Sequence, residues 1–251
     1  MRELLYGRNA VRESLRARRR HIHRLVVADN IEPAAIVNEI LGLARQGNIP
    51  VQRVSRRELD KLSTGHQGVA LETGRYPTID VEAILARAAK LDEPAFIVAL
   101  DHIEDPQNLG AMLRTAEIVG VHGVIIPRRR SAGVTPAVVN ASAGATEHIW
   151  LAEVTNLVEA LKRLKQADVW LVGLEHTPVA LPYTEADLTG AMAVVVGSEG
   201  QGMSRLVRET CDFLVKLPMR GRTESLNASV ACGLILYEVW RARNFIKAAA
   251  K

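Results

Sequence analysis

Five short and almost wholly apolar runs mark the C-terminal two thirds of the chain. They are AFIVAL (95–100), GVIIP (123–127), DVWLVGL (168–174), MAVVVG (192–197) and DFLVKLP (212–218). Runs of this length, rich in β-branched residues, are typical of strands that are buried on both faces, and the longer segments between them are typical of helices. The pattern predicts an α/β fold in which helices cover both faces of a parallel sheet. A last helix, apolar along much of one side, is predicted from about Leu226 to Ile246.

The N-terminal part of the chain alternates shorter helix and strand patterns. Helices are predicted over 7–17, 33–47 and 55–62, and strands over 23–29, 51–54 and 68–73. The third helix begins with Ser55 and Glu58 at the spacing of a capping box, and the second ends at Gly47. Residues 74–94 carry turn residues at both ends and no strand pattern, which indicates a linker that contains a helix. The predicted organisation is a smaller α/β domain at 1–73, this linker, and a larger domain at 95–251.

The sequence VVVGSEGQGMS (194–204) places three glycines in six positions directly after a predicted buried strand. Glycine has no Cβ, so the backbone N–H groups of such a loop can approach a ligand closely. In open parallel sheets, ligands bind beyond the carboxyl ends of the strands. The spacing is neither the GxGxxG of dinucleotide-binding folds nor the GxxxxGK[ST] of phosphate-binding loops. A tight turn into a helix near Ser204, without any ligand, remains the alternative interpretation.

Unusual polar residues follow the first apolar run, in DHIEDPQNLGAMLRTAEIVG (101–120). Pro106 is expected to open a helix, since proline fits the first helical turn. Asn108 and Arg114 lie six positions apart, a net rotation of about 240°, so a straight helix does not place them on one face. If both act at one site, Asn108 belongs to the turn before the helix. The alternatives are an N-cap role for Asn108 and a surface ion pair for Arg114.

Two more strand ends carry polar clusters. Arg128, Arg129 and Arg130 follow the second apolar run, where three adjacent guanidinium groups suit phosphate binding. Ser225, Asn227 and Ser229 cluster at the entrance of the last helix, where capping explains them, although a helix start also presents N–H groups to a ligand. Three loops after parallel strands therefore carry the unusual polar residues of this part of the chain, and we expect them to converge on one site.

Charge is distributed unevenly along the chain, whose formal net charge is +4. Residues 1–76 contain 14 Lys and Arg against 8 Asp and Glu, so the positive excess is N-terminal. The run RARRRHIHR (16–24) holds five arginines and two histidines. Such a run is a plausible footprint for a nucleic-acid backbone, and a solvated loop between a helix and a strand is the alternative. The residues predicted to bind RNA are Arg8, Arg18, Arg19, Arg20, Arg128, Arg129 and Arg130.

Composition excludes several classes of protein. The two cysteines, Cys211 and Cys232, stand in no CxxC or CxxH pattern, so neither a disulfide framework nor a metal site is predicted. The chain shows no secretory leader and no apolar run of about 18 residues, which argues against secretion and membrane insertion. A reducing, cytoplasmic location is expected.

Three segments carry a family resemblance. NLGAMLRTAEIVGVHGVIIP (108–127), VVVGSEGQGMS (194–204) and LPMRGRTESLNASVACGLILYE (217–238) resemble, in order and spacing, the three motifs of the SpoU/TrmH-type RNA ribose 2′-O-methyltransferases of the SPOUT superfamily. Within that family the chain looks most similar to the bacterial enzymes that methylate a guanosine ribose in 23S rRNA. LLYGRNAVRESL and the segment after it resemble their N-terminal RNA-binding domain, which is related to ribosomal protein L30e.

The resemblance implies properties that the residue patterns alone do not. It implies a C-terminal domain threaded into a trefoil knot, a homodimer, S-adenosylmethionine as methyl donor, and 23S rRNA or a ribosomal assembly intermediate as partner. The cofactor-binding positions implied are Gly197, Gly202, Leu217, Pro218, Met219 and Leu226. The catalytic positions implied are Asn108, Arg114, Glu199, Ser225 and Asn227. The resemblance implies that Arg114 activates the ribose hydroxyl with help from an RNA phosphate. Arginine is a poor base at its usual pKa, so the expected role of Arg114 is to position the hydroxyl and stabilise the developing alkoxide, and the acceptor of the proton is left open.

The function expected is therefore methylation of the ribose 2′-OH of a guanosine in 23S rRNA, with S-adenosylmethionine as donor. A methyltransferase acting on tRNA or on another rRNA ribose is an alternative within the class. From another class, the chain could be a non-catalytic RNA-binding protein of the same fold. That hypothesis predicts loss of the arginine and of the glycine loop, and both are present.

Overall fold

The computed structural model describes residues 2–223 and 225–245, and the chain divides into two compact units. The N-terminal unit consists of Met1–Pro77 together with Val134–His148, and the larger unit of Thr78–Gly133 with Ile149–Lys251. Residues 134–148, which the sequence pattern grouped with the larger domain, thus pack with the N-terminal unit.

The N-terminal unit is built on a four-stranded sheet. In spatial order its strands are β1 (Glu3–Tyr6), β4 (Val69–Thr73), β2 (Ile22–Ala28) and β3 (Val51–Val54). The pairs that β4 makes are antiparallel, and β2 pairs with β3 in parallel. The helices are α1 (Arg8–Ala17), α2 (Ala35–Gln46), α3 (Arg56–Leu62), α6 (Pro136–Ala141) and the 3₁₀-helix η1 (Ala145–His148).

Local sequence signals explain the helix ends in this unit. The capping box predicted at α3 is present, with Ser55 accepting from the backbone of Glu58 and Glu58 accepting from the backbone of Ser55. Gly47 caps the end of α2, as predicted. Strand β1 was not predicted, because its four residues run almost directly into α1 and show no extended alternation.

A buried ion pair ties η1 to the sheet of the N-terminal unit. The guanidinium of Arg20 donates to both carboxylate oxygens of Glu147 at 2.8 to 3.0 Å, and both side chains are almost fully buried. Arg20 also donates to Glu3 at 2.6 Å and lies over the ring of Tyr76. Burial raises the pKa of Tyr76 to about 12, so the phenol stays protonated and its hydroxyl donates to the carbonyl of Thr146 at 3.0 Å.

The larger unit contains a seven-stranded sheet in which all pairs are parallel. In spatial order its strands are β7 (Leu151–Val154), β6 (Gly123–Pro127), β5 (Phe96–Leu100), β10 (Met192–Val196), β8 (Trp170–Leu174), β11 (Phe213–Lys216) and β9 (Leu181–Pro182). The five predicted strands and the parallel sheet are confirmed. Strands β7 and β9 were not predicted, since they have only four and two residues and their pairing partners define them.

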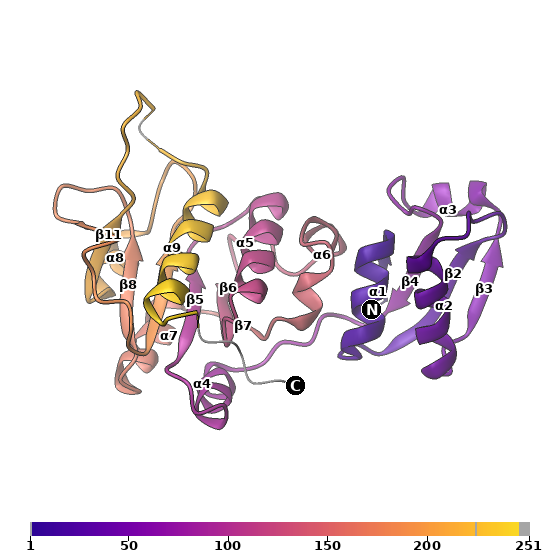
Figure 1. Cartoon of the computed structure of the whole chain (residues 1–251), viewed down its shortest axis with the longest axis horizontal. Helices are drawn as coiled ribbons and strands as arrows, with labels where there is room; N and C mark the ends of the chain where they lie inside the picture. Colours follow the sequence, from indigo (N-terminus) through magenta and orange to yellow (C-terminus); the bar gives the residue numbers. More distant parts are fainter. Residues whose placement is uncertain (1, 224, 246–251) are drawn as a thin grey trace. The chain divides into compact units, whose positions relative to one another are not determined.

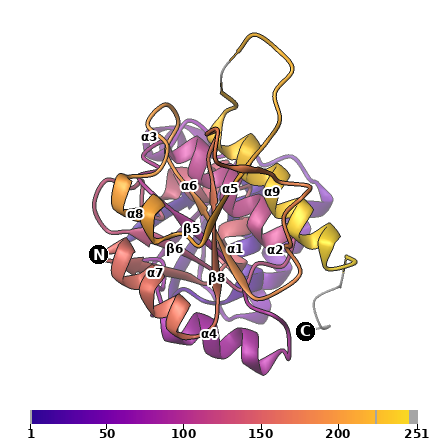
Figure 2. The ribbon, with the colours of Figure 1, turned by 90° about the vertical axis from the view of Figure 1, so that its left-hand side faces the viewer.

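Helices cover both faces of this sheet, as predicted. They are α4 (Val81–Lys90), α5 (Pro106–Ile118), α7 (Leu157–Gln166), α8 (Arg205–Thr210) and α9 (Ala228–Ala242). Figure 2 shows α5 and α9 on one side of the central strands and α7 and α8 on the other. Apolar side chains of α4, α7 and α8 form one buried core with those of the sheet. Ile246, the predicted end of the last helix, lies outside the described residues.

The order of the strands fixes where a ligand can bind. From β5 the chain moves outward through β6 to β7, whereas β10, the other neighbour of β5, leads through α8 to β11 on the opposite side (Figure 1). The loops after β5 and β10 therefore leave the sheet side by side and diverge. Such a switch in direction opens a crevice at the carboxyl ends of the strands.

Over residues 2–223 and 225–245, none of the helices has the length and apolarity needed to span a bilayer.

Candidate active site

The glycine-rich loop after β10 closes on itself. Ser198 and Gly202 exchange backbone hydrogen bonds of 3.1 and 2.9 Å, which folds residues 198–202 into a tight turn. A Cβ on Gly197 would lie 2.1 Å from the carbonyl carbon of Gly202, so no side chain fits there. Gly200 and Gly202 have φ values of +84° and +66°, which glycine adopts without strain. Each glycine is thus required by the turn itself, and helix α8 begins directly after it with Ser204 at the N-cap, as predicted.

A buried carboxylate joins this loop to the loop after β5. Asp101 is only 2 % exposed, and one of its oxygens accepts the backbone N–H of Ser204 at 2.7 Å. Its other oxygen lies 2.8 Å from Nδ1 of His102. Because both carboxylate oxygens are engaged, Asp101 fixes the start of α8 and the ring of His102 together.

An ion pair between Glu175 and Arg208 contacts the end of the glycine-rich loop. The guanidinium of Arg208 donates to both oxygens of Glu175 and to the carbonyl of Met203. The Glu175 carboxylate raises the pKa of Arg208 above its usual value, so this arginine stays charged. Any Cβ on Gly202 would lie 2.8 Å from Glu175, so the ion pair and the glycine pack closely against each other.

Three polar side chains from three different segments of the chain meet at the mouth of the crevice. Nδ2 of Asn227 donates to Oδ1 of Asn108 at 2.9 Å and to Oε2 of Glu199 at 3.1 Å, and Nδ2 of Asn108 lies 3.4 Å from the same oxygen. Asn227 is also the N-cap of α9, accepting from the backbone of Ser229 and Val230. Two of the three segments expected to converge, those that carry Asn108 and Asn227, meet here, and Glu199 joins them from the glycine-rich loop. The third segment contributes Arg130, which borders the larger cavity described below.

The placement of Asn108 differs from both sequence interpretations. Asp105, not Asn108, is the N-cap of α5, and Pro106 opens the helix as predicted. Asn108 lies within the first turn of α5, so it belongs neither to the cap nor to the preceding turn. From this position its amide reaches both Asn227 and Glu199.

A cavity of about 260 Å³ lies between the glycine-rich loop and the segment before α9. Its walls include Gly197, Gly202, Leu217, Met219, Ser225 and Leu226. Pro218 is exposed and is not part of the wall. Apolar side chains and backbone groups make up most of the lining, and the carboxylates of Glu175 and Glu199 border it.

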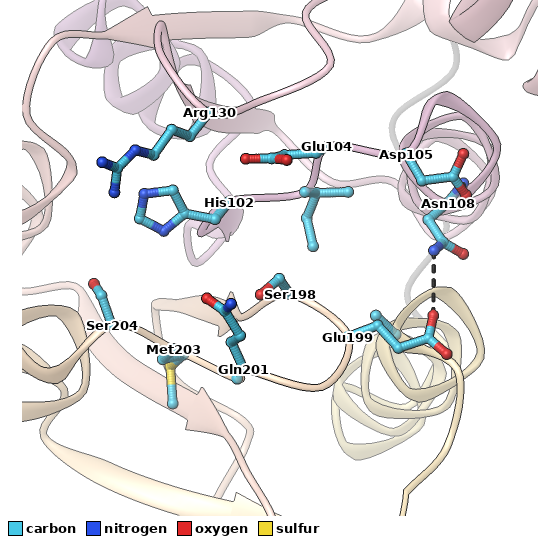
Figure 3. A pocket seen from close by; sticks show the side chains of 13 residues that line it. His102, Glu104, Asp105, Asn108, Arg130, Ser198, Glu199, Gln201, Met203 and Ser204 are labelled. Carbon is cyan, nitrogen blue, oxygen red and sulfur yellow. Dashed lines mark hydrogen bonds between the residues drawn. The ribbon is translucent and has the colours of Figure 1, made fainter.

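A larger cavity of about 750 Å³ opens on the other side of the same loop. Residues 102–105 and Asn108 form one wall, and residues 198–199 and 201–204 form the facing wall. Arg130 and Ala228 complete the lining. Figure 3 shows the hydrogen bond between Asn108 and Glu199 at one end of this cavity and the side chains of His102 and Arg130 at the other. The two cavities share Ser198, Glu199, Gln201, Gly202 and Ala228, so the loop separates two adjoining binding spaces.

Arg114 is not part of either cavity lining. It is exposed on α5, and no ion pair joins it to any residue in the described ranges. The surface ion pair weighed for Arg114 is therefore not found among the described residues. Four positions later Ile118 is 51 % exposed on the same helix, so Arg114 stands beside an exposed apolar side chain.

The predicted basic residues occupy different environments. Arg18 and Arg128 to Arg130 are exposed, and Arg130 borders the larger cavity. The backbone and side chain of Arg8 both donate to Gln67. The guanidinium of Arg19 donates to the carbonyl of Glu147 and lies over the ring of Tyr76.

Arg20 departs from the prediction that the whole arginine run faces RNA. Its side chain is fully buried in the ion pair with Glu147, so its guanidinium is not presented to solvent. The sequence contains no signal that separates Arg20 from its neighbours, because the partner lies 127 positions away.

Two pairs in the site were missed from sequence, namely Asp101 with His102 and Glu175 with Arg208. Both begin at the carboxyl end of a strand, and that position was the available signal. Among the described residues, no group of three or more His, Cys, Asp and Glu side chains could hold a metal ion. Burial raises the pKa of both Cys211 and Cys232 to about 12, so neither thiol is an activated nucleophile.

Two family models match the chain. The SpoU rRNA Methylase family matches residues 95–237, and the model for RNA 2'-O ribose methyltransferase substrate binding matches residues 4–78. The YacO protein of Bacillus subtilis, assigned to the TrmH family of tRNA/rRNA methyltransferases, is 43% identical over 96% of both chains. A TrmH-family relative from Staphylococcus saprophyticus is 45% identical over 97% of both chains.

Solved structures share the fold. The SpoU methyltransferase AviRb from Streptomyces viridochromogenes, in complex with the cofactor AdoMet, superposes with a TM-score of 0.81 at 24% identity, covering 98% of this chain and 92% of that one. The TrmH/SpoU tRNA modifying enzyme of A. aeolicus superposes with a TM-score of 0.55 at 28% identity. The superposition covers 66% of this chain and 85% of that one. The likeness to AviRb extends over both units and confirms the predicted fold class. Since the first family model alone matches more than half of the sequence, the chain belongs to the SpoU rRNA methylase family.

Proposed function

We propose that this protein transfers a methyl group from S-adenosylmethionine to the ribose 2′-OH of a guanosine in 23S rRNA, acting on the rRNA or on a ribosomal assembly intermediate. The observation that carries the proposal is the network of Asn108, Glu199 and Asn227, which stands where the two cavities adjoin. A donor in the smaller cavity and a ribose in the larger one would meet at this network. An N-terminal unit that matches the substrate-binding model gives a second surface for RNA.

The smaller cavity fits S-adenosylmethionine. The contact between Gly197 and the backbone of Gly202 leaves main-chain groups, rather than side chains, facing the cavity, which suits hydrogen bonding to an adenine edge. Leu217, Met219 and Leu226 supply apolar walls for the ring and the thioether region. When bound, the cofactor supplies an activated methyl on a sulfonium.

Positioning of the ribose hydroxyl and stabilisation of the charge on its oxygen are assigned to side chains of this chain. The amide of Asn227 donates to both Asn108 and Glu199 and so holds them at fixed distances. The remaining hydrogen-bonding capacity of Asn108 and Glu199 gives a preorganised set of donors and acceptors for a ribose hydroxyl. Ser225 borders the smaller cavity beside them. Arg114 is assigned to positioning the hydroxyl and stabilising the charge that develops on its oxygen.

The assignment of Arg114 requires a second copy of the chain. Val230, Leu234 and Tyr237 lie at positions i, i+4 and i+7 of α9 and are each 45 to 51 % exposed, and α5 with Ile118 packs beside α9. A stripe of this kind on a helical pair suits an isologous dimer in which the same patch serves both protomers. Arg114 lies one helical turn before Ile118 on α5, and we assign to dimerisation through this stripe the step that brings Arg114 of one protomer to the cavities of its partner.

Leu234→Glu is expected to convert the dimer into monomers, because it places a charge in the middle of the apolar stripe. Size-exclusion chromatography with light scattering measures the change. The matched control is Leu206→Glu, since Leu206 is 55 % exposed on α8, on the other side of the sheet (Figure 2). Equal masses for both variants would contradict the assigned face.

Arg114→Ala is expected to lower kcat by about a hundredfold, which is typical for removal of one group that stabilises transition-state charge. The affinities for S-adenosylmethionine and RNA should change by less than about threefold, since a group that stabilises charge only in the transition state leaves ground-state binding unchanged. Single-turnover methylation and separate binding titrations measure these quantities. A large loss of RNA affinity at unchanged kcat would reassign Arg114 to phosphate contact.

The substrate is tested by transfer of labelled methyl from S-adenosylmethionine to unmodified 23S rRNA and, in parallel, to bulk tRNA. The labelled position is mapped by its resistance to alkaline cleavage, which 2′-O-methylation blocks. Label at one guanosine of 23S rRNA supports the proposal, and label only in tRNA keeps the chemistry and replaces the substrate. Both substrates are in the cytoplasm, where we expect the protein to act.

A further inference from the structure

One end of the larger cavity has no role in the methyl transfer proposed above. Figure 3 shows the side chains of His102, Glu104 and Arg130 at this end, away from the hydrogen bond between Asn108 and Glu199. A ribose held at the network of Asn108 would direct its base along the cavity toward these three residues.

His102 and Arg130 are held in an unfavourable backbone conformation. Their φ values are +58° and +57°, in the left-handed region that glycine adopts with little strain and that other residues seldom adopt. Non-glycine residues in this region persist where the surrounding structure enforces them, and they cluster at functional sites. For His102 the supporting contact is the buried carboxylate of Asp101, 2.8 Å from Nδ1. The ring of His102 is therefore fixed in place, with Nε2 directed away from that contact.

The charged groups at this end leave space for a ligand between them. No ion pair within 4 Å involves Glu104 or Arg130 anywhere in the described part of the chain, although both border the same cavity. His102 is the only side chain with a ring among the described lining residues. An acceptor, a planar donor and a fixed ring at one end of a cavity match the edges and face of a nucleobase.

We propose that His102, Glu104 and Arg130 form the subsite for the base of the methylated nucleotide and that they select guanine. Guanine carries the donors N1–H and N2–H₂ on one edge, which the carboxylate of Glu104 accepts. It carries the acceptors O6 and N7 on the adjoining edge, to which the guanidinium of Arg130 donates. The ring of His102 stacks on the base. Adenine would turn its N1 acceptor toward the carboxylate, which gives discrimination by repulsion.

The inference rests on the proposed function, and analogues of the target nucleotide separate the two. The probe is a synthetic RNA that spans the mapped methylation site, with guanosine, inosine or 7-deazaguanosine at the target position. Inosine lacks the N2 amino group, so the wild-type protein should show a kcat/KM for guanosine about tenfold or more above that for inosine, the loss expected for one charge-assisted hydrogen bond.

Glu104→Ala should bring the guanosine to inosine ratio to within about threefold of unity, because the partner of the amino group is gone. Its matched control, Glu185→Ala, removes an exposed carboxylate outside the cavity lining and should keep the wild-type ratio. Arg130→Ala should likewise remove discrimination against 7-deazaguanosine. His102→Gly should lower kcat/KM for guanosine by about tenfold through lost stacking, and glycine adopts a φ of +58° without strain.

Equal use of guanosine and inosine by the wild-type protein would overturn the base subsite and leave the methyltransferase assignment intact. So would a Glu104→Ala variant that loses activity on both nucleotides equally. Methyl transfer to the ribose of adenosine or a pyrimidine would also refute guanine selection alone. Absence of transfer to any RNA, by protein that binds S-adenosylmethionine, would overturn the proposed function and this subsite with it.

Discussion

Gly197→Ala is expected to lower kcat/KM for methyl transfer by at least about a hundredfold and to abolish measurable binding of S-adenosylmethionine. The new Cβ would lie 2.1 to 2.3 Å from the backbone of Gly202 and Met203, whereas ordinary contacts begin near 3.4 Å. The glycine-rich loop would have to move by more than about 1 Å, and a displacement of that size in a catalytic site costs on the order of a hundredfold. Because Glu199 is on the same loop, cofactor binding and positioning of the ribose should fail together.

Isothermal titration with S-adenosylmethionine and single-turnover methylation measure the two effects. Gly190→Ala is the matched control, because no atom lies within 4 Å of the Cβ built there and its φ is not positive. We expect this control to bind the cofactor as the wild-type protein does. Cofactor affinity within threefold of wild type for Gly197→Ala would show that the loop does not form the cofactor site.

The sheet of the larger unit could be predicted because strands buried on both faces consist of nearly continuous runs of apolar residues. Each of the five predicted strands is a run of apolar residues, and each is present. Strands β1, β7 and β9 have two to four residues, too few to show a period, and exist because a neighbouring strand pairs with them. Local pattern alone does not contain that information.

The grouping of residues 134–148 with the N-terminal unit shows the same limit at a larger scale. The segment follows β6 directly in sequence, so position along the chain favours the larger unit. Its membership is decided by contacts with residues more than 60 positions away, such as Tyr76 with Thr146 and Arg20 with Glu147. Neither partner has a sequence signature that differs from an exposed residue of its type.

In the candidate site, too, some residues could be predicted from the sequence and others could not. Convergence of the segments that carry Asn108 and Asn227 followed from the rule that loops after parallel strands share one edge of the sheet, whereas Glu199 was implied by the family resemblance. The roles of Asp101 and Glu175 could not be predicted from the sequence. A carboxylate at a strand end does not reveal its partner, which is the backbone of Ser204 for Asp101 and the guanidinium of Arg208 for Glu175.

Glu147→Ala is expected to lower the free energy of unfolding of the N-terminal unit by about 3 to 5 kcal/mol, the typical cost of leaving a buried charge without its partner. The side chain of Arg20 is fully buried, and Glu147 provides both of the oxygens that its Nε and Nη2 contact. The second carboxylate near Arg20, that of Glu3, is partly exposed and bonds only Nη1, so it compensates the charge incompletely.

Urea unfolding separates this effect from changes in the larger unit. Trp150, Trp170 and Trp240, the three tryptophans of the chain, all belong to the larger unit, so their fluorescence follows that unit while far-ultraviolet circular dichroism follows both. We expect the dichroism transition of Glu147→Ala to begin at lower urea than the fluorescence transition. A loss seen only in fluorescence would contradict the assignment of residues 134–148 to the N-terminal unit.

A double variant distinguishes the ion pair from simple loss of packing. Arg20→Met with Glu147→Leu replaces both charges by apolar side chains, and such replacements are often neutral for stability. The double variant should therefore be more stable than either single variant, with a coupling free energy of about 1 to 3 kcal/mol in a double-mutant cycle. Additive losses would mean that the two residues stabilise the unit separately, and Arg20 would then be an ordinary packed side chain rather than the partner that joins η1 to the sheet.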